Sequence, residues 1–136
     1  MIGWIVLGVV VLFILSVAGF FLWRRLRAPK LNQDYFKVEW QELQKLLRNK
    51  DRWDVALMRA DNLFDIALKK NRFRGGSMGE RMVKAQKSFT DNDGAWYAHK
   101  LRKQVESEPD FKLKEEEVRA ALIALRQALK DLGALK

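Results

Sequence analysis

The chain has 136 residues and no cysteine, so it can build neither a disulfide framework nor a cysteine-based zinc site. It carries 26 basic and 17 acidic residues, a formal charge of +9, and only two prolines. This composition, rich in Leu, Ala, Lys, Glu and Arg, favours an all-α fold. With a single histidine, most metal sites and most acid–base schemes are excluded, and we expect neither a metal nor a cofactor.

The first segment is an apolar run from Ile2 to Trp23 that contains no charged side chain. As a helix it would reach roughly 33 Å, which matches the hydrocarbon core of a bilayer. The alternative is a cleaved signal peptide with Ser16 to Ala18 at the cleavage site. Against it, no basic region precedes the run, and apolar residues continue past that point. We therefore predict a single transmembrane helix, with residues 1–27 forming the anchor and its basic end.

Basic residues follow the predicted span, and none precedes it. They are Arg24, Arg25, Arg27 and Lys30. The positive-inside bias then places the N-terminus outside and the C-terminal domain in the cytoplasm, as in a single-pass protein of the inner (plasma) membrane. We expect these four residues to contact anionic lipid headgroups, so the lipid bilayer is the first predicted partner.

A linker over residues 28–33 is predicted next, because Pro29 ends the preceding helix. Residues 34–136 are predicted to form one helical bundle domain. Its first helix, about 34–48, has an apolar face made of Phe36, Trp40, Leu43 and Leu47. A second helix to about residue 71 has Asp51 as its expected cap. Its buried stripe is predicted to contain Trp53, Leu57, Ala60, Phe64, Ala67 and Leu68.

Cap and stop signals delimit three further helices. Ser77 and Glu80 have the form of a capping box before a short helix that ends near residue 87. Asp91 or Asp93 is expected to cap a helix over about 95–106. The last helix, about 114–132, ends at Gly133 in the usual stop position. Five helices with short connections predict an up-and-down bundle.

Several stretches of the sequence occur in an order and spacing that together are fairly specific for one group of proteins. They are Trp53-Asp54-Val55-Ala56, Ala60-Asp61-Asn62-Leu63-Phe64-Asp65, Met78-Gly79-Glu80-Arg81-Met82, Ala95-Trp96-Tyr97-Ala98-His99-Lys100-Leu101-Arg102 and Glu108-Pro109-Asp110-Phe111. In these the chain resembles small membrane-anchored bacterial proteins with a HEPN-like helical domain. The resemblance implies a bundle that commonly dimerises, and in many HEPN domains a metal-independent ribonuclease.

The ribonuclease motif that the resemblance implies is Arg-Asn-x-x-x-His, and this chain departs from it. Arg102 is retained, but Lys103 stands where the Asn is expected and Ser107 where the catalytic His is expected. A serine hydroxyl cannot act as a general base near neutral pH as an imidazole can. We therefore favour a protein that is not an enzyme.

Two residues near this motif have alternative roles. His99, three residues before Arg102, is a candidate substitute for the missing imidazole, but we favour a hydrogen-bonded structural role. Arg102 has Asp61 and Asp65 as candidate carboxylate partners from a facing helix, and we favour this structural pairing over phosphate binding. The basic run that contains Lys69, Lys70, Arg72 and Arg74 is typical of a solvated helix end, with contact to headgroups or RNA as the alternative.

The preferred hypothesis is a membrane-tethered, non-catalytic HEPN-like interaction module that faces the cytoplasm. It would act by self-association as a homodimer or by binding a protein partner. The alternative is a metal-independent RNA-binding or RNA-cleaving domain, for which salt-sensitive RNA binding is required. A lipid-surface scaffold without a specific ligand is the third hypothesis.

Overall fold

The computed structural model describes residues 1–26 and 30–136, and all its regular elements in these ranges are helical. A long N-terminal helix, α1 (Ile2–Leu26), precedes five further α-helices. The predicted all-α class, with one apolar N-terminal helix followed by a bundle of five helices, is confirmed. Arg27 and the predicted break at Pro29 lie outside the described residues.

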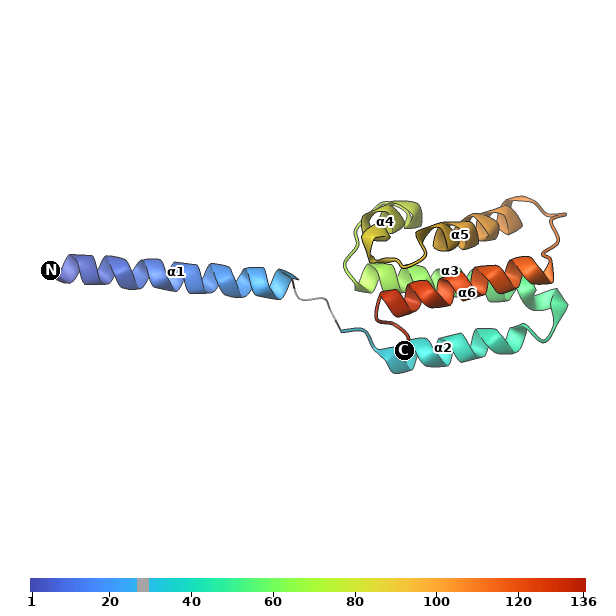
Figure 1. Ribbon diagram of the computed structural model, residues 1–136, viewed down its shortest axis with the longest axis horizontal. Coiled ribbons are helices and arrows are strands. Elements are labelled where there is room, and N and C mark those ends of the chain that lie inside the picture. Colours follow the sequence, from blue (N-terminus) through green and yellow to red (C-terminus); the bar gives the residue numbers. More distant parts are fainter. Residues whose placement is uncertain (27–29) are drawn as a thin grey trace.

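The α1 helix is long and apolar enough to cross a membrane. The segment Ile2–Arg24 has a mean hydropathy of 3.0, and none of its apolar window is buried against the rest of the protein. Figure 1 shows α1 lying apart from the bundle. Its large apolar side chains are therefore exposed, for example Trp4, Phe13 and Trp23.

The first two bundle helices are α2 (Gln33–Leu46) and α3 (Trp53–Lys70), with a 3₁₀ turn, η1 (Lys50–Arg52), between them. Asp51 does not cap α3, so that prediction is wrong. The helical conformation begins earlier, because the Asn49 side chain accepts a hydrogen bond from the Asp51 amide at 3.0 Å and caps the 3₁₀ turn. This turn leads directly into α3, whose N-cap residue is Arg52.

The remaining helices are α4 (Met78–Ala85), a 3₁₀ turn η2 (Gln86–Ser88), α5 (Asn92–Ser107) and α6 (Glu115–Asp131). Ser77 caps α4 by accepting from the Glu80 amide at 3.2 Å, whereas the Glu80 carboxylate accepts from the Gly76 amide and not from Ser77. Asp91 caps α5. Gly133 follows α6 with φ +77°, as its predicted stop position requires.

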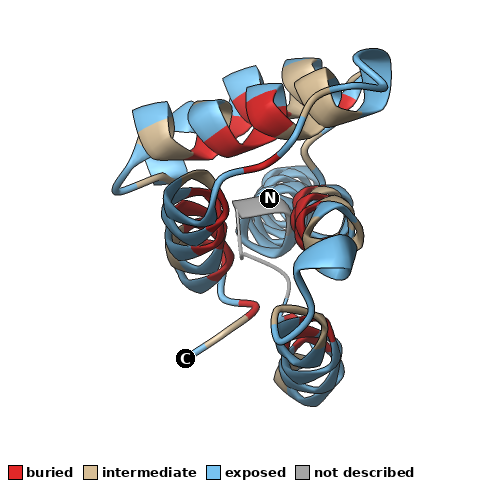
Figure 2. Ribbon diagram, turned by 90° about the vertical axis from the view of Figure 1, so that its right-hand side faces the viewer, coloured by how far each residue is buried: buried red, intermediate tan, exposed pale blue. Residues whose placement is uncertain are grey.

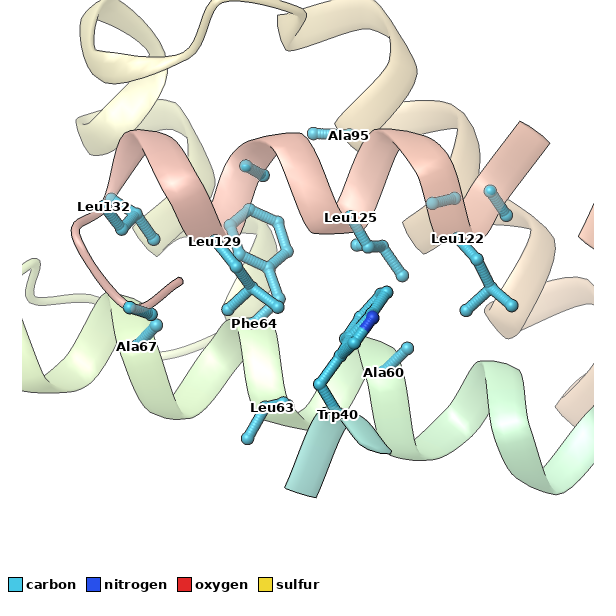
Figure 3. Packing of buried hydrophobic residues seen from close by; sticks show 14 of the residues in the cluster. Trp40, Ala60, Leu63, Phe64, Ala67, Ala95, Leu122, Leu125, Leu129 and Leu132 are labelled. Atoms are coloured by element: carbon cyan, nitrogen blue, oxygen red, sulfur yellow. The ribbon is translucent and has the colours of Figure 1, made fainter. Parts of the chain in front are cut away.

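The α3 helix lies at the centre of the bundle and contacts α2, α4, α5 and α6. Successive long helices run in opposite directions, and short α4 connects the α2–α3 pair to the α5–α6 pair (Figure 1). Buried residues of the bundle helices face its interior (Figure 2). Figure 3 shows the core where Phe64, Leu125 and Leu129 meet between α3 and α6. The predicted apolar stripes of α2 and α3 are buried, apart from half-buried Leu47 and Trp53.

Two hydrogen bonds hold three helix termini together at one end of the bundle. The Gln33 side chain at the start of α2 donates to the Gly133 carbonyl at 3.2 Å. The Asn71 side chain at the end of α3 donates to the Leu132 carbonyl at 3.1 Å. Leu31, just before α2, is buried in the core at this same end. We call this end, defined by Leu31, Gln33, Asn71, Leu132 and Gly133, the tether end.

Candidate functional site

A buried charged cluster lies between α3 and α5. Asp61 lies on the apolar face of α3, four residues after Leu57, and its side chain is fully buried. Its Oδ2 lies 2.9 Å from Nδ1 of His99 and 3.4 Å from Nη1 of Arg102. His99 and Arg102 are three residues apart on α5 and share one helix face, which brings both to the same carboxylate oxygen.

The contact between His99 and Asp61 fixes the orientation of the imidazole ring. When the Asp61 carboxylate is ionised it only accepts hydrogen bonds, and Nδ1 of the imidazole is then the donor. The imidazole is only 4% exposed and contacts the Trp96 ring edge-on, with ring centroids 6.1 Å apart. His99 is therefore almost completely enclosed by protein.

Arg102 links the buried carboxylate to the surface. Its Nη2 lies 2.9 Å from the Glu106 carboxylate one turn later on α5. Within the part of the chain that the structure describes, Asp61 Oδ1 and Arg102 Nε are buried and have no hydrogen-bond partner. A buried network that is only partly satisfied depends strongly on each bond that it does make.

Asp65 belongs to a second ion pair. Arg81 from α4 donates to both of its carboxylate oxygens, at 2.7 and 2.9 Å, and to the Gly75 carbonyl at 2.8 Å. Lys69 adds a contact at 3.5 Å. Burial raises the pKa of the Asp65 carboxyl, but the hydrogen bonds and charges of Arg81 and Lys69 outweigh it and hold that pKa below its ordinary value. The hydrogen bond to Asp65 raises the pKa of Arg81.

The structure separates the residues of the implied ribonuclease motif. Arg102 is turned inward to Asp61, whereas Lys103 is exposed. Ser107 is exposed at the end of α5, where its hydroxyl lies 3.5 Å from the Gln104 carbonyl. Ser107 and His99 are two helical turns apart, so they do not form one site. Of the two candidate partners for Arg102, Asp61 is in contact with it and Asp65 is paired with Arg81.

Sequence reasoning missed Arg81. No periodic pattern singles it out, because its partner Asp65 comes from a different helix 16 residues earlier. An arginine in the middle of a short helix that follows a glycine loop was the available signal. Among the expected headgroup contacts, Arg24 and Lys30 are exposed. In residues 1–26 and 30–136, no group of three or more acidic or histidine side chains is arranged to hold a metal.

A groove runs between α2 and α6, and it is formed by two adjoining hollows of about 360 and 290 Å³. Both hollows share Trp40, Gln44 and Arg126. Its apolar lining is Trp40, Leu47, Trp53, Val118, Leu122, Ile123 and Leu135. Its charged lining is Asp34, Lys37, Glu115, Arg119, Arg126 and Lys136.

The charges along this groove are unequal. Glu115 and Arg119 form an ion pair at 3.0 Å and neutralise each other. The other charges comprise three basic residues and one acidic residue, Asp34, so the edges carry an excess of positive charge. Ile123 on α6, which belongs to the apolar lining, is 65% exposed.

No protein-family model, no curated protein and no solved structure matches this chain.

Proposed function

We propose that the chain is a single-pass protein of the inner (plasma) membrane, with its N-terminus outside and its bundle in the cytoplasm. The length and apolar character of α1 support the span. Arg24 and Lys30 follow the apolar segment, and basic residues beside a span favour the cytoplasmic side, which supports this orientation. In the same proposal, the bundle is HEPN-like, as the order of the sequence motifs suggests.

The bundle is a non-catalytic interaction module in this proposal. The observation that carries this is the position of His99, the only histidine in the chain, which is 4% exposed and bound to buried Asp61. A general acid or base must reach the proton that it transfers, and this imidazole is almost completely enclosed by protein. Ser107 is accessible, but its side chain is a hydroxyl and not the imidazole that would activate a nucleophile at this position.

The binding surface is the groove between α2 and α6, and its occupant is an amphipathic helix of a protein partner with acidic side chains flanking its apolar face. The apolar lining fits the apolar face of such a helix. The excess of basic residues at the edges, from Lys37, Arg126 and Lys136, favours acidic flanks. The 14 residues of α2 span about 21 Å, enough for a partner helix of several turns.

Site-specific photo-crosslinking in native membranes tests this surface. A photoreactive amino acid replaces Ile123 in the groove, and the matched control replaces Val83 on α4, which is 52% exposed. We expect a crosslinked partner at position 123 only, attached through an acidic amphipathic helix, and lost when Lys37→Glu and Arg126→Glu are combined. Equal crosslinking at both positions, or products that contain only a second copy of this chain, would contradict the proposed occupant.

A further inference from the structure

A dense basic segment lies at the tether end. Between Lys69 and Arg74 four of the six residues are basic and none is acidic. Asn71, in the middle of this segment, is hydrogen-bonded to the end of α6. Through that bond and the one from Gln33 to Gly133, the basic segment shares one end of the bundle with the chain that leads to α1.

The connection to α1 is short. The helix ends at Leu26, and Leu31 is already buried in the bundle core. The five steps between their Cα atoms span at most about 18 Å when fully extended. If α1 spans a bilayer, the tether end cannot move farther than this from the end of the span. This short connection keeps the basic segment within reach of the headgroups, and electrostatic attraction acts once the two are within about 10 Å.

A hollow of about 420 Å³ opens within this segment, lined by Lys69, Arg72, Phe73, Arg74, Gly75 and Arg81. Asp65 already contacts Lys69 and Arg81. Arg72 and Arg74 are exposed, and neither forms an ion pair with any described residue. The hollow therefore has two arginines whose charge is uncompensated, and a guanidinium binds phosphate oxygens in a bidentate manner.

The backbone at Arg72 has an unusual conformation. Its φ of +67° is the one positive value among the described non-glycine residues. The Arg72 amide donates to Lys69 and the Phe73 amide to Leu68, which is the hydrogen-bond pattern that ends a helix at a left-handed residue. Glycine is strongly preferred at this position, so an arginine here carries backbone strain. The strained position places a guanidinium at the hollow, which suggests a function.

We propose that this hollow binds the phosphate group of anionic lipids in the membrane that α1 spans, and docks the bundle on its tether end. The proposal rests on the proposed membrane span. The opposite end of the bundle offers a matched comparison, because the turn between α2 and α3 also carries three basic residues, Arg48, Lys50 and Arg52. Asp51 and Asp54 lie next to these basic residues in the sequence. The turn between α2 and α3 is far from the tether end (Figure 1).

Energy transfer from the bundle to labelled lipid headgroups tests the docking. The chain has no cysteine, so Ser88→Cys and Ser107→Cys each give one labelling site in the full chain. Ser88 lies two residues before Thr90, whose amide donates to Asp131 at the end of α6, near the tether end, whereas Ser107 ends α5 at the far end. The protein is reconstituted into vesicles of phosphatidylcholine, alone or mixed with phosphatidylglycerol. The test variant is Lys70→Gln with Arg72→Gln and Arg74→Gln. The control variant is Arg48→Gln with Lys50→Gln and Arg52→Gln.

With phosphatidylglycerol, we expect transfer to rise for the label at position 88 relative to the label at position 107. Each basic side chain near an anionic surface contributes about fivefold, so the test variant should lower the ratio of docked to undocked bundle by at least tenfold. The control variant should retain docking, and raising the salt from about 0.1 M to 1 M should abolish it. Equal loss in both variants, or no effect of phosphatidylglycerol, would overturn the proposal.

Two further measurements separate this proposal from others. Flotation of the protein with either kind of vesicle reports the insertion of α1. Its loss would refute the span and the docking together, whereas flotation without any effect of lipid charge would refute the docking alone. A short RNA is added to the protein in phosphatidylcholine vesicles. RNA binding that depends on Lys70, Arg72 and Arg74, without an effect of phosphatidylglycerol, would assign the basic segment to RNA instead.

Discussion

Replacement of Asp61 by alanine tests whether the cluster between α3 and α5 holds the bundle together. The substitution removes a fully buried carboxylate and leaves His99 without its acceptor. Breaking a buried pair by removal of one partner typically costs about 3–5 kcal/mol. Arg102 is 20% exposed and keeps Glu106, so it can turn toward solvent. We therefore expect a loss at the lower end of this range, about 3 kcal/mol.

Urea unfolding of the full chain in detergent micelles, followed by circular dichroism, measures this loss as a fall in the free energy of unfolding. Glu106→Ala is the matched control, because Glu106 contacts the same arginine but lies at the surface. An exposed pair contributes about 1 kcal/mol or less. If Asp61→Ala costs no more than Glu106→Ala, the cluster does not stabilise the bundle and the structural interpretation of His99 fails.

A double-mutant cycle then isolates the contact between the two helices. Asp61→Ala and His99→Ala are measured singly and together. Because the two side chains are in direct contact at 2.9 Å and buried, we expect a coupling free energy of about 1–3 kcal/mol. Additive effects, with no coupling, would mean that His99 stabilises the bundle by packing against Trp96 alone.

Three further predictions concern stability. The pKa of Asp65 is held below its ordinary value. Its contribution to the free energy of unfolding is therefore present above about pH 4 and is lost as the pH falls through the lowered pKa. Asp65→Asn should make the free energy of unfolding depend less steeply on pH in that range. Leu125 is fully buried, and Leu125→Ala should cost about 2–5 kcal/mol in urea unfolding. Gly133 has φ +77°, so Gly133→Ala should lower the free energy of unfolding by about 1 kcal/mol. Arg72 has φ +67°, so Arg72→Gly should raise the free energy of unfolding. Thermal melts of the two variants check both signs.

Helical periodicity was sufficient to predict the bundle. Apolar residues at spacings of three and four identify the buried faces, and Phe36, Trp40 and Leu43 are buried as that pattern requires. The cap at Asp51 was wrong because two polar residues close together, Asn49 and Asp51, can both start a helical turn. Only the local backbone decides between them, and here Asn49 accepts the first amide.

The partners within the candidate site could not be chosen from the sequence. Asp61 and Asp65 lie one turn apart on α3, so both face the same general direction. The relative shift of α5 along α3 decides that Arg102 contacts Asp61. Asp65 is instead contacted by Arg81, whose position depends on how α4 crosses the bundle. Such relations depend on tertiary packing and leave no periodic signal.

The measurement that tests the central claim most directly is RNA cleavage by the full chain in lipid vesicles, with His99→Asn and Ser107→His as comparisons. His99 is the only histidine, so His99→Asn removes every imidazole from the protein. If the bundle is a non-catalytic interaction module, the wild-type chain and His99→Asn will both be inactive. Cleavage by the wild-type chain that His99→Asn abolishes would contradict this account and make the protein an enzyme.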